Sequence, residues 1–447
     1  MGLIKRFSGI LNGGVIFTGN TLGLSKAPNA NAPGTQGSIG TFICLDPAQK
    51  DGGFPWGTTG DWRENGSKAV LNLPSDSEVV YAELIWGGSY RYGGEDVTNY
   101  LDNPVLFYTP AGVFEVAPDI TTAQTYTSPF YFYVRSARVT DLVKSAGNYA
   151  AGRIPATQGY LENHSNHAGW TLAVIYQNPA TAAKTIHLWV GGELPGNLIY
   201  LNGFHPPHPV NIMGRLFVSA QEGDANLTGD QLLYGANPNN LLPLSGPNNP
   251  ADNFFASQIN DSNGFLDTSG SFGFENHVPG KNGVAKRQGW DITSIDLAER
   301  LLPAQTEIYL KGTTETDGYL INALALQINV STPVKKQPLK LSRYDLHIPS
   351  FGQPDFFLQY DYEFYLPYEN RTVIHGIVRN PEGYPVPGAV VKFFKKGDCE
   401  NLQPIGHVIT DDCGQFIFGP VEDGITLLLK VFKQKFDSLQ GTAKPKK

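Results

Sequence analysis

The sequence predicts an all-β protein, with a large β-sandwich or jelly-roll domain that carries long loops and a small Greek-key β-sandwich. Three observations predict this class. The 447 residues include 50 Gly and 32 Pro, which interrupt long helices. Aromatic residues make up 12% of the chain and charged residues only 17%, a balance that favours half-buried strands over solvated amphipathic helices. Short apolar runs also recur between clusters of turn residues, as in sandwich and jelly-roll folds.

The first 37 residues are predicted to form a separable N-terminal arm. Residues 15–24 form one apolar run, and residues 25–40 are rich in Ala, Asn, Pro and Gly, as in an extended segment. Because an apolar strand can add to the open edge of another sheet, we expect this arm to pair with a neighbouring copy. The residues predicted to mediate this assembly are Val15, Ile16, Phe17, Leu22 and Leu24.

The large domain is predicted to span residues 38–335. Its expected strands are 39–44, 68–73, 78–86, 104–108, 130–139, 170–176, 185–190, 198–201, 215–220, 308–311 and 321–330. Apolar residues at helical spacing predict two short helices, at 139–145 and 295–302. Residues 202–289 contain few periodic runs and many Asn, Pro and Gly residues, so they are expected to form long loops.

A second domain is predicted after a Tyr- and Phe-rich connector at 336–369. Residues 370–435 hold short strands separated by turns, and residues 436–447 form a polar tail. The stretch 376–391 (GIVRNPEGYPVPGAVV), followed by 410–418 (TDDCGQFIF), resembles the carboxypeptidase-regulatory-like, prealbumin-type sandwich. In that family the module is a spacer or adhesion unit without catalytic residues.

The large domain resembles the amino-terminal β-domain of surface proteins from spore-forming Gram-positive bacteria. The segments that carry the resemblance include 20–26 (NTLGLSK), 32–41 (APGTQGSIGT), 82–90 (AELIWGGSY), 169–178 (GWTLAVIYQN) and 289–293 (GWDIT). The resemblance implies a location on a cell or spore surface, and a structural or adhesive role rather than a reaction. One prealbumin-like module replaces the repeat array usual in that family, which favours a compact subunit.

Composition and motifs exclude several functional classes. The formal net charge of −8 does not provide the basic surface that nucleic-acid binding requires. The sequence contains no run of 18 consecutive apolar residues, so it predicts no membrane-spanning helix. Neither a signal peptide nor a Leu-Pro-x-Thr-Gly sortase signal is recognisable, so we expect deposition on an extracellular surface, such as a spore or its appendages, without the usual export route. Without a nucleophile elbow, phosphate-binding loop or dinucleotide fingerprint, we expect no enzyme activity and no organic cofactor.

The segment 222–230 (EGDANLTGD) is the candidate metal site. Glu222, Asp224, Asn226 and Asp230 offer hard oxygen ligands that suit calcium, although their spacing differs from that of an EF-hand. The alternative interpretation is an Asx-rich turn between strands.

Two histidine pairs are also spaced like metal ligands on a turn, His164 with His167 and His205 with His208. The alternative is that these are loop histidines bonded to backbone or water.

The three cysteines bear on covalent assembly. Cys399 and Cys413 lie in neighbouring loops of the small domain and are disulfide candidates. This pairing leaves Cys44, which either cross-links to another copy or remains a buried thiol.

Together these features predict a non-enzymatic structural subunit of a bacterial cell- or spore-surface assembly. It is expected to bind copies of itself and to form a filament or layer by donating its N-terminal strand. The alternative is a surface adhesin that binds glycans, a host or other surface proteins. Trp56, Trp62, Tyr90 and Tyr92 would serve that alternative by stacking on sugar rings, although sandwich cores use the same residue types.

Overall fold

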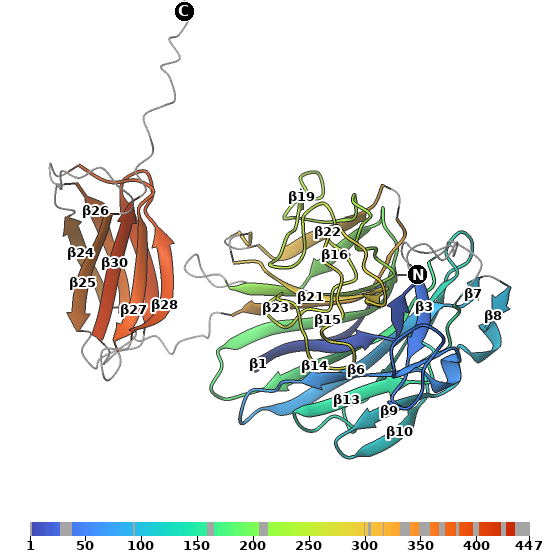
Figure 1. The fold of residues 1–447 in the computed structure, drawn as a ribbon. Helices are drawn as coiled ribbons and strands as arrows, with labels where there is room; N and C mark the ends of the chain where they lie inside the picture. Colours follow the sequence, from blue (N-terminus) through green and yellow to red (C-terminus); the bar gives the residue numbers. More distant parts are fainter. Residues whose placement is uncertain are drawn as a thin grey trace, which may run out of the picture. The chain divides into compact units, whose positions relative to one another are not determined.

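A computed structural model shows the chain as two compact units, residues 1–331 and 332–447 (Figure 1). The division falls within a few residues of the predicted end of the large domain at 335. The structure describes residues 2–26, 38–92, 94–158, 165–204, 213–298, 300–302, 305–315, 317–330, 340–347, 358–365, 372–380, 384–396, 402–421 and 426–433.

Both units are built from β-strands, which confirms the all-β class. Helix in the described residues is limited to two 3₁₀ turns, η1 (Trp62–Glu64) and η2 (Thr98–Tyr100). The two helices predicted at 139–145 and 295–302 are wrong. The first segment is a turn, and Ile295 lies in a strand, where sheet pairing outweighs the helical spacing of the apolar residues. No helix of the described chain is both long enough and apolar enough to span a membrane.

A nine-stranded sheet runs through the large unit. Its strands, in spatial order, are β11 (Gln124–Thr125), β12 (Phe132–Arg138), β6 (Glu78–Ser89), β14 (Ala168–Gln177), β1 (Ile4–Thr21), β15 (Ala183–Glu193), β23 (Leu320–Asn329), β17 (Gly214–Gln221) and β21 (Trp290–Asp296).

The strand β1 lies at the centre of this sheet, which corrects the prediction of a separable arm at 1–37. Its residues Gly13–Thr21 pair with β14, and its residues Ile4–Asn12 pair with β15. An apolar strand is more stable when it is paired and buried in its own sheet than when it extends into water. All five residues predicted to mediate assembly are therefore buried, namely Val15, Ile16, Phe17, Leu22 and Leu24.

The two halves of the nine-stranded sheet pack face to face, and each half also has an outer layer. Because side chains alternate along a strand, Ile85 of β6 lies in the core between the halves, whereas Trp86 lies in an outer core. One outer layer is β10 (Gly112–Val116), β9 (Val105–Thr109), β13 (Gly147–Gly152) and β5 (Gly66–Leu71). The other is β16 (Leu198–Asn202), β22 (Glu307–Thr313), β18 (Gln231–Gly235) and β19 (Leu242–Pro243) (Figure 1).

Two smaller sheets complete the large unit. The chain leaves β1 directly into one of them, formed by β20 (Arg287–Gln288), β2 (Gly23–Ser25), β3 (Ile39–Ile43) and β4 (Thr58–Thr59). The other is the hairpin of β7 (Arg91–Tyr92) and β8 (Glu95–Asp96).

The small unit is a sandwich of two sheets. One contains β24 (Lys340–His347), β26 (Thr372–Arg379) and β29 (Gln415–Val421); the other contains β25 (Leu358–Tyr365), β30 (Thr426–Lys433), β27 (Val390–Lys396) and β28 (Leu402–Ile409). Phe393 stacks on Phe418 at 3.8 Å between ring centroids in its core. The segment 336–369 is therefore more than a connector, because β24 and β25 pair with strands of the sandwich. The predicted tail at 436–447 lies outside the described residues.

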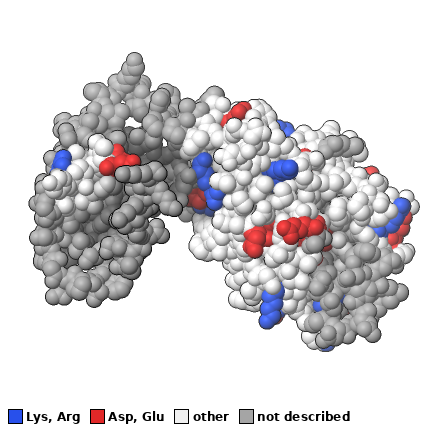
Figure 2. All heavy atoms as spheres, turned by 90° about the horizontal axis from the view of Figure 1, so that it is seen from above, with Lys and Arg blue, Asp and Glu red and all other residues white. Residues whose placement is uncertain are grey.

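Surface charge is sparse and mixed on the face of the protein shown in Figure 2. Lys and Arg side chains there stand in small groups, often beside Asp and Glu, between wide areas of uncharged residues. The described part of that face therefore offers no continuous basic band for phosphate groups.

Candidate metal centre

A group of acidic residues gathers where β17 ends, and the sheet topology explains why they meet. Because β17 and β23 are antiparallel neighbours and Gln221 pairs with Leu320, Glu222 lies beside the loop that contains Asp317. Asp291 lies on β21, which pairs with the other edge of β17 opposite Ala220.

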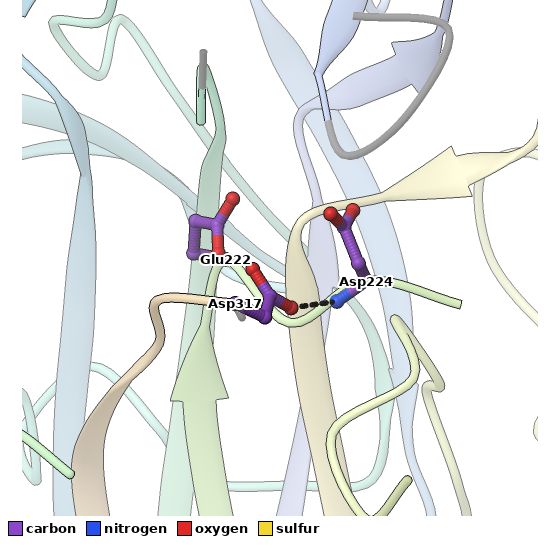
Figure 3. Close-up of side chains that lie close together, drawn as sticks. All are labelled: Glu222, Asp224 and Asp317. Carbon is purple, nitrogen blue, oxygen red and sulfur yellow. Dashed lines mark hydrogen bonds between the residues drawn. The ribbon is translucent and has the colours of Figure 1, made fainter. Parts of the chain in front are cut away.

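Three of these acids form a compact set. Side-chain oxygens of Glu222, Asp224 and Asp317 all lie within 4.8 Å of one another, and all three residues are buried (Figure 3). The backbone N–H of Asp224 donates to Oδ2 of Asp317 at 2.9 Å, and the N–H of Gly318 donates to Oδ1 at 2.7 Å. The loop geometry therefore fixes the Asp317 carboxylate against Asp224.

Two further buried acids border this set. Asp230 is 0% exposed and Asp291 is 2% exposed. Asp291 accepts a hydrogen bond from the N–H of Gln258 at 2.8 Å through Oδ1. The charges of Asp317 and Asp291 both act on Asp230, so the five carboxylates form one electrostatic cluster.

Burial and mutual repulsion make ionisation of these carboxyl groups costly. Desolvation, followed by the charge of Asp317, raises the pKa of Glu222 and Asp224 well above the usual range. The same two causes raise the pKa of Asp230 to about 9. Desolvation raises the pKa of Asp291 well above its usual value. The cluster must therefore hold either protons or a cation at neutral pH.

Many oxygens in and around the cluster have no hydrogen-bond partner. The group comprises Oε2 of Glu222, both Oδ atoms of Asp230, Oδ2 of Asp291, Oδ1 of Asn226 and Asn253, and Oε1 of Gln288. Buried polar atoms normally have partners, since leaving one unpaired costs about 1–3 kcal/mol. A donor set of carboxylate and amide oxygens matches a hard cation such as Ca²⁺, which takes six to eight oxygens, rather than zinc.

The backbone around the site is strained to hold the acids in place. Glu222 has a φ of 89°, in the left-handed region that costs other residues about 1–2 kcal/mol relative to Gly. A Cβ at the next position, Gly223, would meet the Phe255 carbonyl oxygen at 2.2 Å, so only Gly fits there. Strain of this kind is characteristic of functional sites.

The structure brings together part of the predicted calcium site and adds two acids that the sequence did not indicate. Glu222 and Asp224 lie in the compact set, Asp230 borders it, and Asn226 lies in the same loop with a free oxygen. Sequence reasoning missed Asp317 and Asp291. A buried acid between Trp290 and Ile292 in a strand is the one signal that could have indicated Asp291.

Of the two predicted histidine pairs, the structure describes only His167. His167 is buried, with Nδ1 2.8 Å from the Ser165 carbonyl oxygen and Nε2 3.2 Å from Oε1 of Gln221. Burial lowers its pKa to about 4, so it is a neutral internal residue. His164, His205 and His208 lie outside the described residues.

The four aromatic residues considered for sugar stacking have different environments. Trp56 is exposed beneath the Lys50 ammonium, and Trp62 packs against Tyr100. Tyr90 is buried and Tyr92 is half-buried, and both pack on Tyr131. Trp56, at 65% exposed, is the most accessible of the four to a sugar, whereas Tyr90 is buried.

The described cysteines are free thiols. Cys44 is buried, donates to the Asp46 carbonyl at 3.3 Å, and has a pKa raised by burial, so it is poorly placed to cross-link another copy. Cys413 is exposed in the Asp411–Gly414 turn, and its proposed partner Cys399 lies outside the described residues.

Comparisons with known proteins do not assign this chain to a family. No protein-family model and no curated protein matches the sequence. The crystal structure of dimeric latent PorU from Porphyromonas gingivalis is similar over 78% of this chain and 32% of that chain, with 10% identity and a TM-score of 0.17. This chain spans about a third of the length of that chain, and a similarity with so low a TM-score supports no argument. The fold and the cluster therefore define the class themselves, as an all-β protein with a buried oxygen-rich candidate metal centre.

Proposed function

We propose that this chain is a non-enzymatic, calcium-binding structural protein of a bacterial cell or spore surface. One observation carries the proposal, namely the buried carboxylate cluster around Glu222, Asp224 and Asp317 with its unpartnered oxygens. A cation there would neutralise acids that otherwise repel one another in a low-dielectric interior.

Burial favours a structural role for this cation over a catalytic one. Glu222 is 1% exposed and Asp230 is 0% exposed, so a substrate could not reach the ion without opening the loops. The ion would join the end of β17 to the loop before β23 and to the segment at Gln288, whose Nε2 donates to Asp224. Calcium would thus hold together loops from distant parts of the chain.

The surface location in this proposal rests on the resemblance of the large domain to surface proteins of spore-forming bacteria. Self-association by strand donation takes a changed form, because β1 is paired within its own sheet. Donation would require β1 of one copy to replace β1 of the next, as in domain swapping.

Calcium titration of the EDTA-treated full-length protein tests the proposal. Calcium at 100 times its dissociation constant should stabilise the fold by about 2.7 kcal/mol and raise Tm by about 5 °C. Calorimetric titration should show binding in the wild type and weaker binding in Glu222→Gln. The matched control is Asp252→Asn, which removes an exposed carboxylate near the same loops and should bind calcium like the wild type. Absence of both binding and thermal stabilisation in the wild type would overturn the proposal.

A further inference from the structure

When all five of its carboxylates are ionised, the cluster carries more negative charge than one divalent cation can balance. Five carboxylates are buried together, those of Glu222, Asp224, Asp230, Asp291 and Asp317. None of the ion pairs formed by the described residues includes any of them. One Ca²⁺ would leave three negative charges in the interior, whereas two would leave one.

One buried cation close in sequence to the cluster does not supply the missing charge. Arg287 directly precedes Gln288, but its Nε donates to Asn276 at 2.6 Å and its Nη2 donates to the Asp267 carbonyl at 2.6 Å. Its guanidinium is therefore engaged with groups outside the cluster.

Three of the five acids are close enough to one another to share one ion. Two oxygens bound to one Ca²⁺ at 2.3–2.6 Å lie at most about 5 Å apart. Oxygens of Glu222, Asp224 and Asp317 lie within 4.8 Å of one another, in a set that does not include Asp230. A single ion held by the first three would leave Asp230 without a counter-ion.

Asp230 has its own set of unused oxygens. Neither of its Oδ atoms has a hydrogen-bond partner, although the residue is fully buried. Its backbone forms a parallel bridge with Asn253, whose Nδ2 donates to the Ala225 carbonyl at 2.8 Å and whose Oδ1 has no partner. Oδ1 of Asn226, in the same loop, is also unpartnered. These oxygens are the ligand types of a second hard cation.

We propose that the cluster holds two calcium ions, the first bound by Glu222, Asp224 and Asp317 and the second by Asp230 with Asn253 and Asn226. The charges of Asp317 and Asp291 act on Asp230 as well as on Asp224, so both ion positions would lie in one cluster of charges. This inference rests on the proposed function, because it specifies the stoichiometry of the same site.

The test measures calcium bound per chain in the full-length protein, by native mass spectrometry and by calorimetric titration. We expect two ions in the wild type, one in Asp230→Asn and two in the control Asp252→Asn. One ion in the wild type would overturn the two-ion inference and leave the proposed function intact, whereas no ion would overturn both.

A second variant keeps the assignment testable if Asp230→Asn does not fold. Asn226→Ala leaves all five carboxylates in place and should weaken the second binding step at least several-fold, with the first step unchanged. Equal loss of both steps would overturn the assignment of Asn226 to a separate ion.

Discussion

Two glutamates of the large unit are equally buried, yet their surroundings differ. Glu83, on β6, is 0% exposed and accepts hydrogen bonds from Nε of Arg6 at 3.1 Å, from the hydroxyl of Ser136 at 2.6 Å and from the hydroxyl of Tyr81. Glu222 is 1% exposed, faces other acids and leaves Oε2 without a partner.

The comparison shows that burial alone does not indicate a metal site. At Glu83, β1 supplies an arginine, and β12 and β6 itself supply hydroxyl groups, so the charge is balanced within the protein. At Glu222, the surrounding carboxylates form no ion pair with a Lys or Arg among the described residues, so protons or a cation from solution must balance their charge.

The largest expected effect is a pH dependence of the metal-free protein. Because the pKa of Asp230 is raised to about 9 in the folded state, folded Asp230 keeps a proton that the unfolded chain releases near pH 4. Stability should therefore fall as pH rises, by about 2–3 kcal/mol between pH 7 and 9. Urea unfolding in EDTA would measure this slope, and saturating calcium should reduce it.

The histidines do not complicate that measurement. Burial lowers the pKa of His167 and of His277 to about 4, so both are neutral in the folded state, and the unfolded histidines are largely neutral above pH 7. A flat pH dependence in EDTA would contradict the prediction.

The next largest effect on stability is expected at Glu83, the glutamate whose charge Arg6 balances. Arg6→Ala would leave Glu83 buried with only hydroxyl partners and should lower the free energy of unfolding by about 2 kcal/mol. The loss should be the same in calcium and in EDTA, as measured by urea unfolding. The double variant Arg6→Met with Glu83→Gln should recover part of it, because no unpaired charge then remains. A loss of unfolding free energy that differed between calcium and EDTA would contradict the view that the charge of Glu83 is balanced within the protein.

A smaller effect on stability, that of Asp224→Asn, should have opposite signs in EDTA and in calcium. Asp224→Asn keeps an oxygen for the Nε2 of Gln288, which lies 3.1 Å from Oδ1, and removes one buried negative charge. We expect it to stabilise the EDTA-treated protein at pH 8 by about 1–2 kcal/mol and to destabilise the calcium-loaded protein by a similar amount. Thermal unfolding in both buffers would show this, and the same sign in both would argue against a cation at Asp224.

The smallest effect is expected at an exposed acid. Glu115 pairs with Arg153 at 3.1 Å, and the two side chains are 64% and 44% exposed. Glu115→Gln should change stability by less than about 0.5 kcal/mol, with or without calcium. A larger change in the free energy of urea unfolding would show that solvent screens the Glu115–Arg153 pair less than is usual for an exposed ion pair.

The sequence predicted the all-β class because turn residues and aromatic content report local backbone preferences. It also predicted Glu222 and Asp224, since they lie two residues apart in one acidic loop. Asp317 could not be predicted, because it joins them only through the pairing of Gln221 with Leu320. Such contacts depend on strand order, which local composition does not determine.

The same limit explains the wrong prediction of an arm. The run from Val15 to Leu24 has the composition of a donated strand and of an internal strand alike. A donated strand and an internal strand differ only in the strands with which they pair. Here Thr21 pairs with Gly169, about 150 residues further along the same chain. The apolar pattern correctly predicted a strand but could not show which sheet it joins.

The central position of β1 has a consequence for biosynthesis. Translation releases β1 from the ribosome well before β14 and β15, the strands with which it pairs. The strand β1 therefore cannot pair until β14 and β15 have been synthesised. Contacts so distant in sequence also make folding slow. A nascent chain that stops short of β14 would expose β1 as an unpaired apolar strand, which is a site for aggregation until its partner strands are made.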